Sequence, residues 1–340
     1  MSPAVSVIVT AYNSAAWLRR AIDSVRAQEF ADFEVIVVDD GSTDNTGEIC
    51  ASYGSAIRYI RQENRGAGGA RNTGIREAQG PYLAFLDADD EYLPNKLGDL
   101  VPLLRDAPDD IAGAGGLYLL RAHQGEWRHP VLERLAIAPG GSGRIDFLAS
   151  TVRSGTSTIH TSSMILRREI LDRLGLFRED LCFSEDFEMW CRISGRYDWM
   201  LLGKPVSVYH WNPAHSHTLR IPWGLRGFNC FYSREEAGRR IEPRRIQAYR
   251  RLCMNLGYPQ FWDSVRFRRR DLVADALRRL VPPGPSFRYA VMWWVARMPV
   301  WSWLPLARAR GFMVWLGWKA CGAKKRALRM LGLAGRHAAG

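Results

Sequence analysis

The sequence predicts an α/β fold in which a mostly parallel sheet is flanked by helices and followed by a basic, tryptophan-rich helical extension. Three observations predict it. Apolar runs alternate with amphipathic segments through the first hundred residues, which indicates parallel strands joined by right-handed crossovers. Two of these runs, 35–38 and 82–86, end abruptly at carboxylates. From residue 219 onward, arginine-rich and tryptophan-rich helical stretches replace the alternation.

The elements of the first half follow from the spacing of apolar residues. Continuous runs with β-branched residues indicate strands, and apolar residues at every third or fourth position indicate helices. The first helix has Asn13 or Ser14 as its expected N-cap, the second is capped by Ser42 or Asp44, and the third is closed by Gly80. The expected strands are 5–10, 33–38, 57–60 and 82–86, and the expected helices are 15–28, 44–52 and 70–78.

After Pro94 the alternation is less regular. Pro139 to Gly143 reads as a loop, and Ser184 precedes a helix with two acidic residues at its start. The expected helices are 95–104, 145–152, 167–174 and 185–194, and the expected strands are 111–120, 163–166 and 206–209. No internal repeat is visible.

Length and charge divide the chain. At 340 residues with 47% hydrophobic content, it has room for about two folded domains, expected at 1–218 and 219–340. The first part holds 22 Lys/Arg against 29 Asp/Glu, a net charge of −7, and the second holds 25 against 6, a net charge of +19. A basic rear half indicates an anionic partner, either nucleic acid or an anionic membrane surface.

The cysteines and the N-terminus indicate the compartment. No two cysteines have Cys-x-x-Cys or metal-ligand spacing, so reduced thiols in a cytosolic protein are expected. The N-terminus enters a strand at once and has no signal-peptide pattern. The six cysteines are Cys50, Cys182, Cys191, Cys230, Cys253 and Cys321.

The rear region combines basic helices with tryptophan. Arginine-rich helices are expected at 239–251 and 266–280, followed by a proline-rich break at 282–285 and a segment, 287–318, with six of the thirteen tryptophans. Arginine and proline interrupt every stretch that approaches the roughly 20 apolar residues of a spanning helix. The segment is therefore predicted either to lie in a membrane interface or to pack internally as a helical bundle.

Two carboxylate-tipped strands predict a ligand site. In open α/β sheets, ligands bind at the carboxyl ends of the strands. Asp39 and Asp40 follow one strand, and Asp87, Asp89 and Asp90 follow another. Two carboxylates on a tight turn suit a hard divalent cation whose other ligands are phosphate oxygens.

These and three further motifs together resemble glycosyltransferase family 2. The resemblance covers about residues 4–210 and implies an inverting, nucleotide-sugar-dependent enzyme of the GT-A fold, with its nucleotide-sugar-binding and catalytic domain at 1–218. The motifs are Val5–Asn13, Val37–Asp44, Asn64-Arg65-Gly66 with Ala70-Arg71-Asn72, Asp87–Asp90, and Glu185-Asp186.

The resemblance implies a role for each residue of the nucleotide side. Asp40 accepts from the imide N–H of uracil, with Asp39 as the alternative or as a loop cap. Thr10 and Tyr12 border the base, although Tyr12 is equally well explained by packing. Arg71, with the N–H groups of the 66–69 loop, offsets the diphosphate charge, or is a surface helix arginine.

The resemblance also assigns the metal and the base. Asp89 binds a divalent cation, Mn²⁺ or Mg²⁺, that bridges the diphosphate, and Asp87 holds ribose or the metal and its water shell. Asp90 orients the other two or caps a helix. Asp186 is the general base that takes the proton of the acceptor hydroxyl, with Glu185 as the alternative base. For both residues the structural alternative is a helix-capping role.

Weaker expectations concern histidine and tryptophan. His210, His215 and His217 cluster after a strand, and His210 is the one that could touch metal or diphosphate. Trp190 and Trp211 could stack on an acceptor sugar, with core packing the stronger reading of Trp190.

The expected function is transfer of a single sugar from a nucleotide-sugar, foremost a UDP-sugar, to a saccharide or lipid-linked acceptor in cell-surface polysaccharide assembly. Processive synthases of the family carry Gln-x-x-Arg-Trp and several spanning helices, which this sequence lacks. The expected location is cytoplasmic, peripheral on the inner membrane face, and no nucleic-acid partner is expected. The alternatives are a sugar nucleotidyltransferase and a non-enzymatic binder of anionic polymers that uses the basic half.

Overall fold

The computed structural model describes residues 2–122, 125–128, 137–154, 157–181, 183–210, 230–280, 287–300, 303 and 305–307. These residues form two compact units. One contains the described residues up to 210 together with 230–255, and the other contains the described residues from 256 onward. The units do not divide the chain at residue 218, because 230–255 pack with the first.

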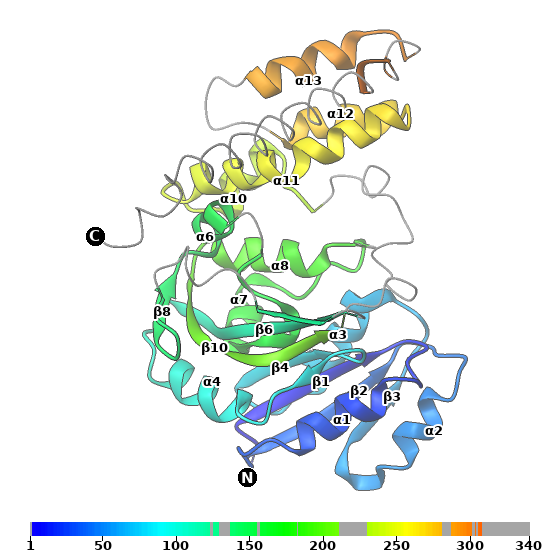
Figure 1. Ribbon diagram of the computed structural model, residues 1–340, viewed down its shortest axis with the longest axis vertical. Helices are drawn as coiled ribbons and strands as arrows, with labels where there is room; N and C mark the ends of the chain where they lie inside the picture. Colours follow the sequence, from blue (N-terminus) through cyan, green and yellow to red (C-terminus); the bar gives the residue numbers. More distant parts are fainter. Residues whose placement is uncertain are drawn as a thin grey trace, which may run out of the picture. The chain divides into compact units, whose positions relative to one another are not determined.

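One sheet forms the framework of the first unit, in the order β3-β2-β1-β4-β9-β6-β10-β5, with β7 paired to β6 and β8 to β10 (Figure 1). β1 pairs in parallel with both β2 and β4, β2 with β3, and β6 with β10. The strands are β1 Val5–Ala11, β2 Phe33–Asp39, β3 Arg58–Arg61, β4 Tyr82–Asp87, β5 Glu91–Tyr92, β6 Ile111–Ala122, β7 Gly125–Arg128, β8 Ser142–Ile145, β9 Met164–Arg167 and β10 Asp198–His210.

Helices cover both faces of this sheet. α1 and α4 pack on one face, where the buried valines of β1 and β2 meet Leu18, Ile22, Leu97 and Leu100. α3 and α8 lie on the other side (Figure 1). The helices of the first unit are α1 Leu18–Arg26, α2 Thr46–Ala51, α3 Gly66–Glu77, α4 Lys96–Arg105, α6 Phe147–Ser154, α7 Arg168–Leu174, α8 Glu185–Ser194 and α10 Arg234–Arg240, with 3-10 turns η1 Gly54–Ala56 and η2 Thr161–Ser163. This arrangement confirms the predicted α/β class.

The sheet is more mixed than the alternation predicted. β9 enters between β4 and β6 and runs antiparallel to both, and β5 and β8 are antiparallel to β10. β10 is also far longer than the expected 206–209, because register shifts near Leu202 and Pro205 let it continue past irregular positions. Strand direction in this half depends on tertiary pairing, which local apolar patterns do not encode.

Several predicted boundaries were wrong. α1 begins at Leu18, because the main chain turns at 15–17 and the carbonyl of Ser14 accepts the first two N–H groups. α3 begins at Gly66, so the expected glycine loop is its first turn. A Cβ on Gly69 would lie 2.5 Å from Arg65 Cβ, and one on Gly68 would lie 3.1 Å from the carbonyl oxygen of Arg178, so glycine permits a close approach here.

The rear helices also differ from the prediction. The expected helix 239–251 is split, because α10 ends at Arg240 and α11, Ile246–Arg266, starts after a turn. In the second unit, α12 is Arg270–Arg279 and α13 is Phe287–Arg297. Trp293 and Trp294 are 48% and 54% exposed, whereas Trp303 is buried. Among the described residues, no helix is both long and apolar enough to span a membrane.

Some predicted features lie outside the described residues. They are the break at 282–285, Cys182, Cys321, Trp211, His215, His217, Trp301, Trp315 and Trp318.

Candidate active site

The carboxyl ends of β1, β2 and β4 meet at one edge of the sheet. Parallel registry places Ala11 opposite Asp39 on one side of β1, and Thr10 opposite Asp87 on the other. The Thr10 hydroxyl donates to Asp87 Oδ1 over 3.4 Å, so these two predicted site residues touch. Tyr12, directly after β1, is 46% exposed at the same edge.

Asp39 and Asp40 are both buried but serve different partners. Asp39 accepts from the N–H of Ser42 at 2.8 Å and from the hydroxyl of Tyr59 at 2.8 Å, so both oxygens hold the following loop and β3. Asp40 accepts through Oδ1 alone, from Gln62 Nε2 at 2.7 Å and from the N–H of Arg65 at 2.9 Å. Its Oδ2 has no hydrogen-bond partner among the described residues. Of the two, Asp40 is therefore the carboxylate that keeps an acceptor for a ligand.

Arg71 joins the two acidic motifs. Its Nη2 donates to Asp87 Oδ1 at 2.8 Å and its Nη1 donates to Glu185 Oε1 at 2.6 Å, while the side chain is almost fully buried beside the Phe177 ring. Burial opposes its charge, but Asp87, Glu185 and Asp186 outweigh that effect and raise the pKa of Arg71 above its ordinary value. The alternative prediction, that Arg71 is an arginine on the exposed surface of a helix, was wrong.

The two carboxylates on Arg71 respond differently to their surroundings. Burial opposes the charge of Asp87, yet the Arg71 guanidinium prevails and holds the pKa of Asp87 below its usual value. For Glu185, burial is the stronger effect, and the pKa is raised even though Arg71 opposes this. Asp87 is therefore the more firmly ionised member of the cluster.

The remaining aspartates of the β4 turn face opposite ways. Asp89 is exposed, and withdrawal of water by the protein around it, together with the charge of Asp87, raises its pKa to about 6. Asp90 is fully buried and accepts from the Ser162 hydroxyl at 2.5 Å and from the N–H of His210 at 3.2 Å. Asp90 therefore holds the turn from the protein interior, whereas Asp87 and Asp89 lie toward the surface.

The 3-10 turn η2 connects this turn to the start of α8, and sequence reasoning missed it. The Thr161 hydroxyl donates to Asp186 Oδ2 over 3.4 Å, and the Ser162 hydroxyl accepts from the N–H of Asp87 at 3.3 Å while it donates to Asp90. Beneath it, the buried ammonium of Lys96 donates to the Ser162 carbonyl at 3.0 Å and lies 3.4 Å from the Tyr92 ring centroid. No motif marks these residues.

Burial has a strong effect on Lys96. It lowers the pKa of the ammonium well below its ordinary value, against the attraction of Asp90, whose own pKa burial raises well above its ordinary value. Through its bond to the Ser162 carbonyl, Lys96 links α4 to η2 and so to both acidic motifs.

Glu185 and Asp186 open α8, which has the predicted bounds. Ser184 before them has a positive φ of 60°, a left-handed conformation that turns the chain into the helix. Asp186 Oδ1 accepts from the N–H of its neighbour Phe187 at 2.6 Å. Glu185 is bound to an arginine, whereas the partners of Asp186 among the described residues are uncharged donors.

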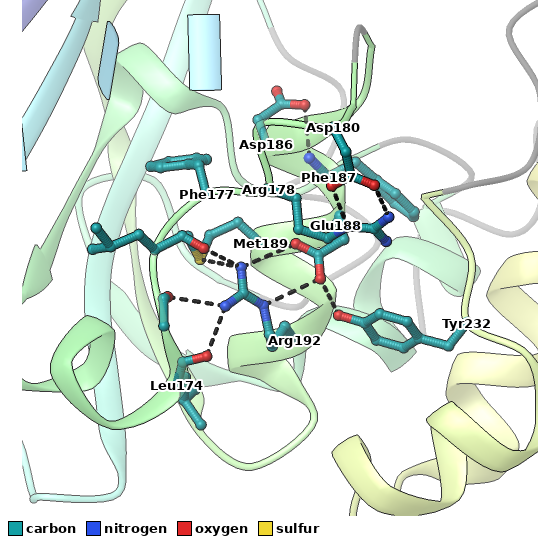
Figure 2. A network of polar contacts seen from close by, with 12 residues as sticks. Leu174, Phe177, Arg178, Asp180, Asp186, Phe187, Glu188, Met189, Arg192 and Tyr232 are labelled. Atoms are coloured by element: carbon teal, nitrogen blue, oxygen red, sulfur yellow. Dashed lines mark hydrogen bonds and ion pairs between the residues drawn. The ribbon is translucent and has the colours of Figure 1, made fainter. Parts of the chain in front are cut away.

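A buried network fixes α8 in place (Figure 2). Glu188 and Arg192 are paired at 3.0 Å, with exposed side-chain fractions of 0% and 6%, and the Tyr232 hydroxyl donates to the same carboxylate. Arg192 also donates to the carbonyls of Leu174, Gly175 and Leu176. The i,i+4 spacing of a Glu and an Arg was visible in the sequence, but its burial was not.

The remaining predicted residues have structural partners. His210 pairs with Glu91 at 2.9 Å, and its pKa is lowered, mainly by burial. Trp190 is 1% exposed and packs edge-on against Phe177 and Trp199, as its core reading predicted.

The metal expectation can be tested against the donor set. Among the described residues, no group of three or more His, Cys, Asp or Glu side chains is arranged to hold an ion. Two surface carboxylates, Asp87 and Asp89, are nevertheless sufficient where the substrate supplies phosphate oxygens, which is how Mg²⁺ is usually held. Withdrawal of water raises the pKa of Asp89 most, and the nearby charge of Asp87 adds to this; a bound cation would offset the second effect. The residues therefore fit a metal shared with a diphosphate.

Comparison with known proteins adds independent findings. The profile of Glycosyl transferase family 2 matches residues 6–175, half of the chain. An uncharacterized glycosyltransferase of Rickettsia felis is 35% identical over 195 residues, covering 56% of this chain and 31% of the relative. RP339 of Rickettsia prowazekii, also an uncharacterized glycosyltransferase, is 34% identical over 200 residues, covering 56% and 58%. The chain thus matches well under two thirds of the length of these relatives.

Solved structures share the fold. TarS of S. aureus in complex with UDP-GlcNAc superposes with a TM-score of 0.67 at 17% identity and covers 91% of each chain. The mannosyltransferase PcManGT of Pyrobaculum calidifontis, in complex with GDP-Man and Mn²⁺, gives a TM-score of 0.55 at 21% identity, covering 91% of this chain and 85% of that one. The predicted GT-A architecture is confirmed, and with the family profile matching half of its length, the chain belongs to glycosyltransferase family 2.

Proposed function

We propose that this protein is an inverting glycosyltransferase that moves a single sugar from a nucleotide-sugar, foremost a UDP-sugar, onto a saccharide or lipid-linked saccharide acceptor. The observation that supports this most directly is the ion-paired cluster of Asp87, Arg71 and Glu185. Through the Arg71 guanidinium, this cluster joins Asp87, which is proposed to lie at the nucleotide-sugar, to the acidic pair at the start of α8. Family membership and the nucleotide-sugars named in the TarS and PcManGT complexes agree with this proposal.

The nucleotide would lie across the ends of β1 and β2. Asp40 offers Oδ2 to the imide N–H of uracil, while Gln62 and the Arg65 N–H fix its other oxygen. Tyr12 is exposed where the base would lie, and Thr10 contacts Asp87 next to it. A carboxylate held by two donors keeps its orientation, which favours a base that presents an N–H over one that presents only acceptors.

Asp87 and Asp89 would hold Mn²⁺ or Mg²⁺ against the diphosphate. When bound, the cation would stabilise the charge on the departing nucleoside diphosphate as a Lewis acid. Asp90, Ser162 and the N–H of His210 keep the turn in place without contacting the surface. In this structure both Nη atoms of Arg71 lie on carboxylates, so we assign it first to positioning Asp87 and Glu185, and its contact with the diphosphate stays a prediction.

Asp186 is the proposed general base. It would accept the proton of the acceptor hydroxyl as that oxygen attacks the anomeric carbon, on the face opposite the diphosphate. One displacement of this kind inverts the configuration. Glu185 remains the alternative, but its Oε1 already accepts from Arg71 at 2.6 Å, so a proton taken up on that oxygen would break the ion pair that holds Arg71.

The rear half supports the proposed acceptor and cellular setting. Its net charge of +19 and the exposed Trp293 and Trp294 suit a peripheral contact with an anionic membrane surface, where lipid-linked acceptors lie. We propose a location on the cytoplasmic face of the inner membrane and a role in cell-surface polysaccharide assembly. No nucleic-acid partner is proposed.

The experiment is release of nucleoside diphosphate from a panel of UDP-, dTDP- and GDP-sugars, in Mn²⁺, Mg²⁺ or EDTA, with wild type and Asp89→Ala. Release from one donor that EDTA and the substitution both abolish is the expected result. A wild type that turns over no donor, and binds no nucleotide by calorimetry, would overturn the proposed function. The matched control is Asp99→Ala, an aspartate of α4 that pairs with Lys204 outside the site.

A further inference from the structure

Three aromatic rings gather beside the candidate site. Tyr118 of β6 and Tyr209 of β10 come from parallel neighbours, with Tyr118 opposite Ser207. Since Tyr209 is two positions beyond Ser207, both tyrosines leave the sheet on the same face. The ring centroid of His160 lies 5.0 Å from that of Tyr118 and 4.8 Å from that of Tyr209, and the two tyrosine rings are 6.2 Å apart.

This aromatic group, Tyr118, His160 and Tyr209, lies next to both acidic motifs. His160 directly precedes η2, whose Thr161 contacts Asp186 and whose Ser162 contacts Asp90. The charges of Asp87, Arg71 and Lys96 act on His160, and those of Asp90, Asp89 and Asp87 act on Tyr209. Because η2 contacts both Asp90 and Asp186, and His160 directly precedes it, the three rings lie beside the turn that joins the two acidic motifs.

The three rings are partly exposed and uncharged. All three side chains are half-buried, so each retains exposed surface. Burial, the main effect, lowers the pKa of His160 to about 4, so the imidazole is neutral at neutral pH.

We propose that the aromatic group is the wall against which the transferred sugar ring of the donor packs. Apolar and aromatic walls with a few polar groups are typical of sites for small ligands, and the C–H face of a pyranose offers such a surface. The occupant is the donor sugar and not the acceptor, because that sugar is bonded directly to the diphosphate. It must therefore lie beside Asp87 and Asp89. The inference rests on the proposed function and adds to it a subsite that selects the sugar.

The test separates sugar binding from nucleotide binding. Calorimetry in Mn²⁺ would compare UDP with UDP-glucose and UDP-GlcNAc, and GDP with GDP-mannose, for wild type, Tyr209→Ala and His160→Ala. An aromatic contact of about 0.5–1.5 kcal/mol corresponds to a rise of roughly 2- to 12-fold in the Kd of the nucleotide-sugar. The Kd of the bare nucleotide should change less than about twofold, because it does not reach the wall.

Two control variants keep the result interpretable. Tyr209→Phe preserves the ring and should keep the wild-type Kd for the nucleotide-sugar. Tyr53→Ala truncates an aromatic whose hydroxyl bonds Asp23 on α1, outside the site, and should change neither Kd. Normal thermal unfolding of each variant excludes a folding defect.

Three outcomes would overturn the inference. Equal loss of nucleotide and nucleotide-sugar binding would make the rings merely structural. Unchanged binding of both the nucleotide and the nucleotide-sugar would show that the aromatic group does not contact the donor sugar. A rise confined to the KM of the acceptor would show that the group contacts the acceptor sugar instead. In all three cases wild type still binds its donor, so the proposed function survives. A wild type that binds no nucleotide on the panel would remove both proposals.

Discussion

At the scale of single residues, the neighbours Glu185 and Asp186 show how contacts separate two chemically similar groups. Glu185 is held by a guanidinium at 2.6 Å, whereas Asp186, within the part of the chain that the structure describes, accepts from the Thr161 hydroxyl and the Phe187 N–H. A general base needs an available electron pair and the correct geometry. The contacts therefore favour Asp186 as the base and assign Glu185 to holding Arg71.

The first prediction compares these two residues directly. Asp186→Asn should reduce the rate of sugar transfer by about 10²–10⁴ and leave donor affinity nearly unchanged, because a proton acceptor is lost but no donor contact is. Glu185→Gln should keep at least roughly a tenth of the rate, since its role is positional. Transfer kinetics and donor calorimetry on the two variants measure this. Equal losses, or a larger loss in Glu185→Gln, would contradict the assignment.

The second prediction concerns pH. Asp89 has a pKa raised to about 6, so it is ionised above that pH and protonated below it. A cation binds the ionised form, so the affinity for Mn²⁺ in the presence of UDP should fall by up to about tenfold per pH unit below 6, and binding near pH 6 should release a proton. Mn²⁺ titrations at pH 5, 6 and 7 measure this. Asp89→Asn should bind weakly without this pH dependence; an equally steep dependence in the variant would assign the proton elsewhere.

The sequence predicted the chemistry of these residues better than their partners. Asp40, Asp87 and Asp89 follow strands, and strand ends are readable from apolar runs. The sequence could not show that Asp39 accepts hydrogen bonds from Tyr59 and Ser42. Tyr59 reaches Asp39 through the pairing of β2 with β3. Thr161, Ser162 and Lys96 belong to no motif and reach the site through long-range packing.

At the scale of elements, α8 is anchored by the buried Glu188–Arg192 pair. Removal of one partner of a buried pair leaves an uncompensated charge, which typically destabilises by about 3–5 kcal/mol. The same pair holds the carbonyls of 174–176, so it fixes both the helix that presents Asp186 and the loop before it.

The third prediction tests this anchor. Arg192→Met should lower the free energy of unfolding by about 3–5 kcal/mol and reduce the transfer rate with it, as α8 loosens. Tyr232→Phe removes one hydrogen bond and should lower it by about 1–3 kcal/mol. The matched control is Arg173→Met, from the exposed i,i+4 pair with Glu169, expected within about 0.5 kcal/mol of wild type. Urea unfolding of the three variants measures these free energies. Similar losses of unfolding free energy in Arg192→Met and Arg173→Met would show that burial of the Glu188–Arg192 pair does not matter for stability.

Elements could be predicted where one local signal dominates. The bounds of α8 were predicted correctly, because two acidic residues mark its start and apolar spacing marks its length. The start of α3 was not, since four residues of mostly glycine read as a loop but fit a helix that packs closely on its neighbours. The antiparallel entry of β9 was also missed, because β9 pairs with β4 and β6 across the fold.

At the scale of the whole molecule, charge is separated along the chain. The net charge of residues 1–218 is −7 and that of residues 219–340 is +19. Packing of a hydrophobic core does not require this separation of charge. Such a field attracts an anionic surface and is screened by salt. In the second unit, Arg297 lies over the Trp293 ring at 3.1 Å, and both tryptophans of α13 are exposed. Arginine with exposed tryptophan is typical of elements that lie in the membrane interface.

The last prediction tests this contact by flotation with vesicles. The protein should float with vesicles rich in phosphatidylglycerol at 50 mM salt, and not with vesicles of phosphatidylcholine alone, because each Lys or Arg near an anionic surface adds about 1 kcal/mol. Binding should weaken strongly at 500 mM salt. Replacement of Trp293 and Trp294 by alanine should reduce the bound fraction at least about threefold, since the rings supply the apolar part of binding. Binding to neither vesicle at low salt would contradict the membrane proposal; binding unaffected by the double substitution would leave a purely electrostatic contact and remove α13 from it.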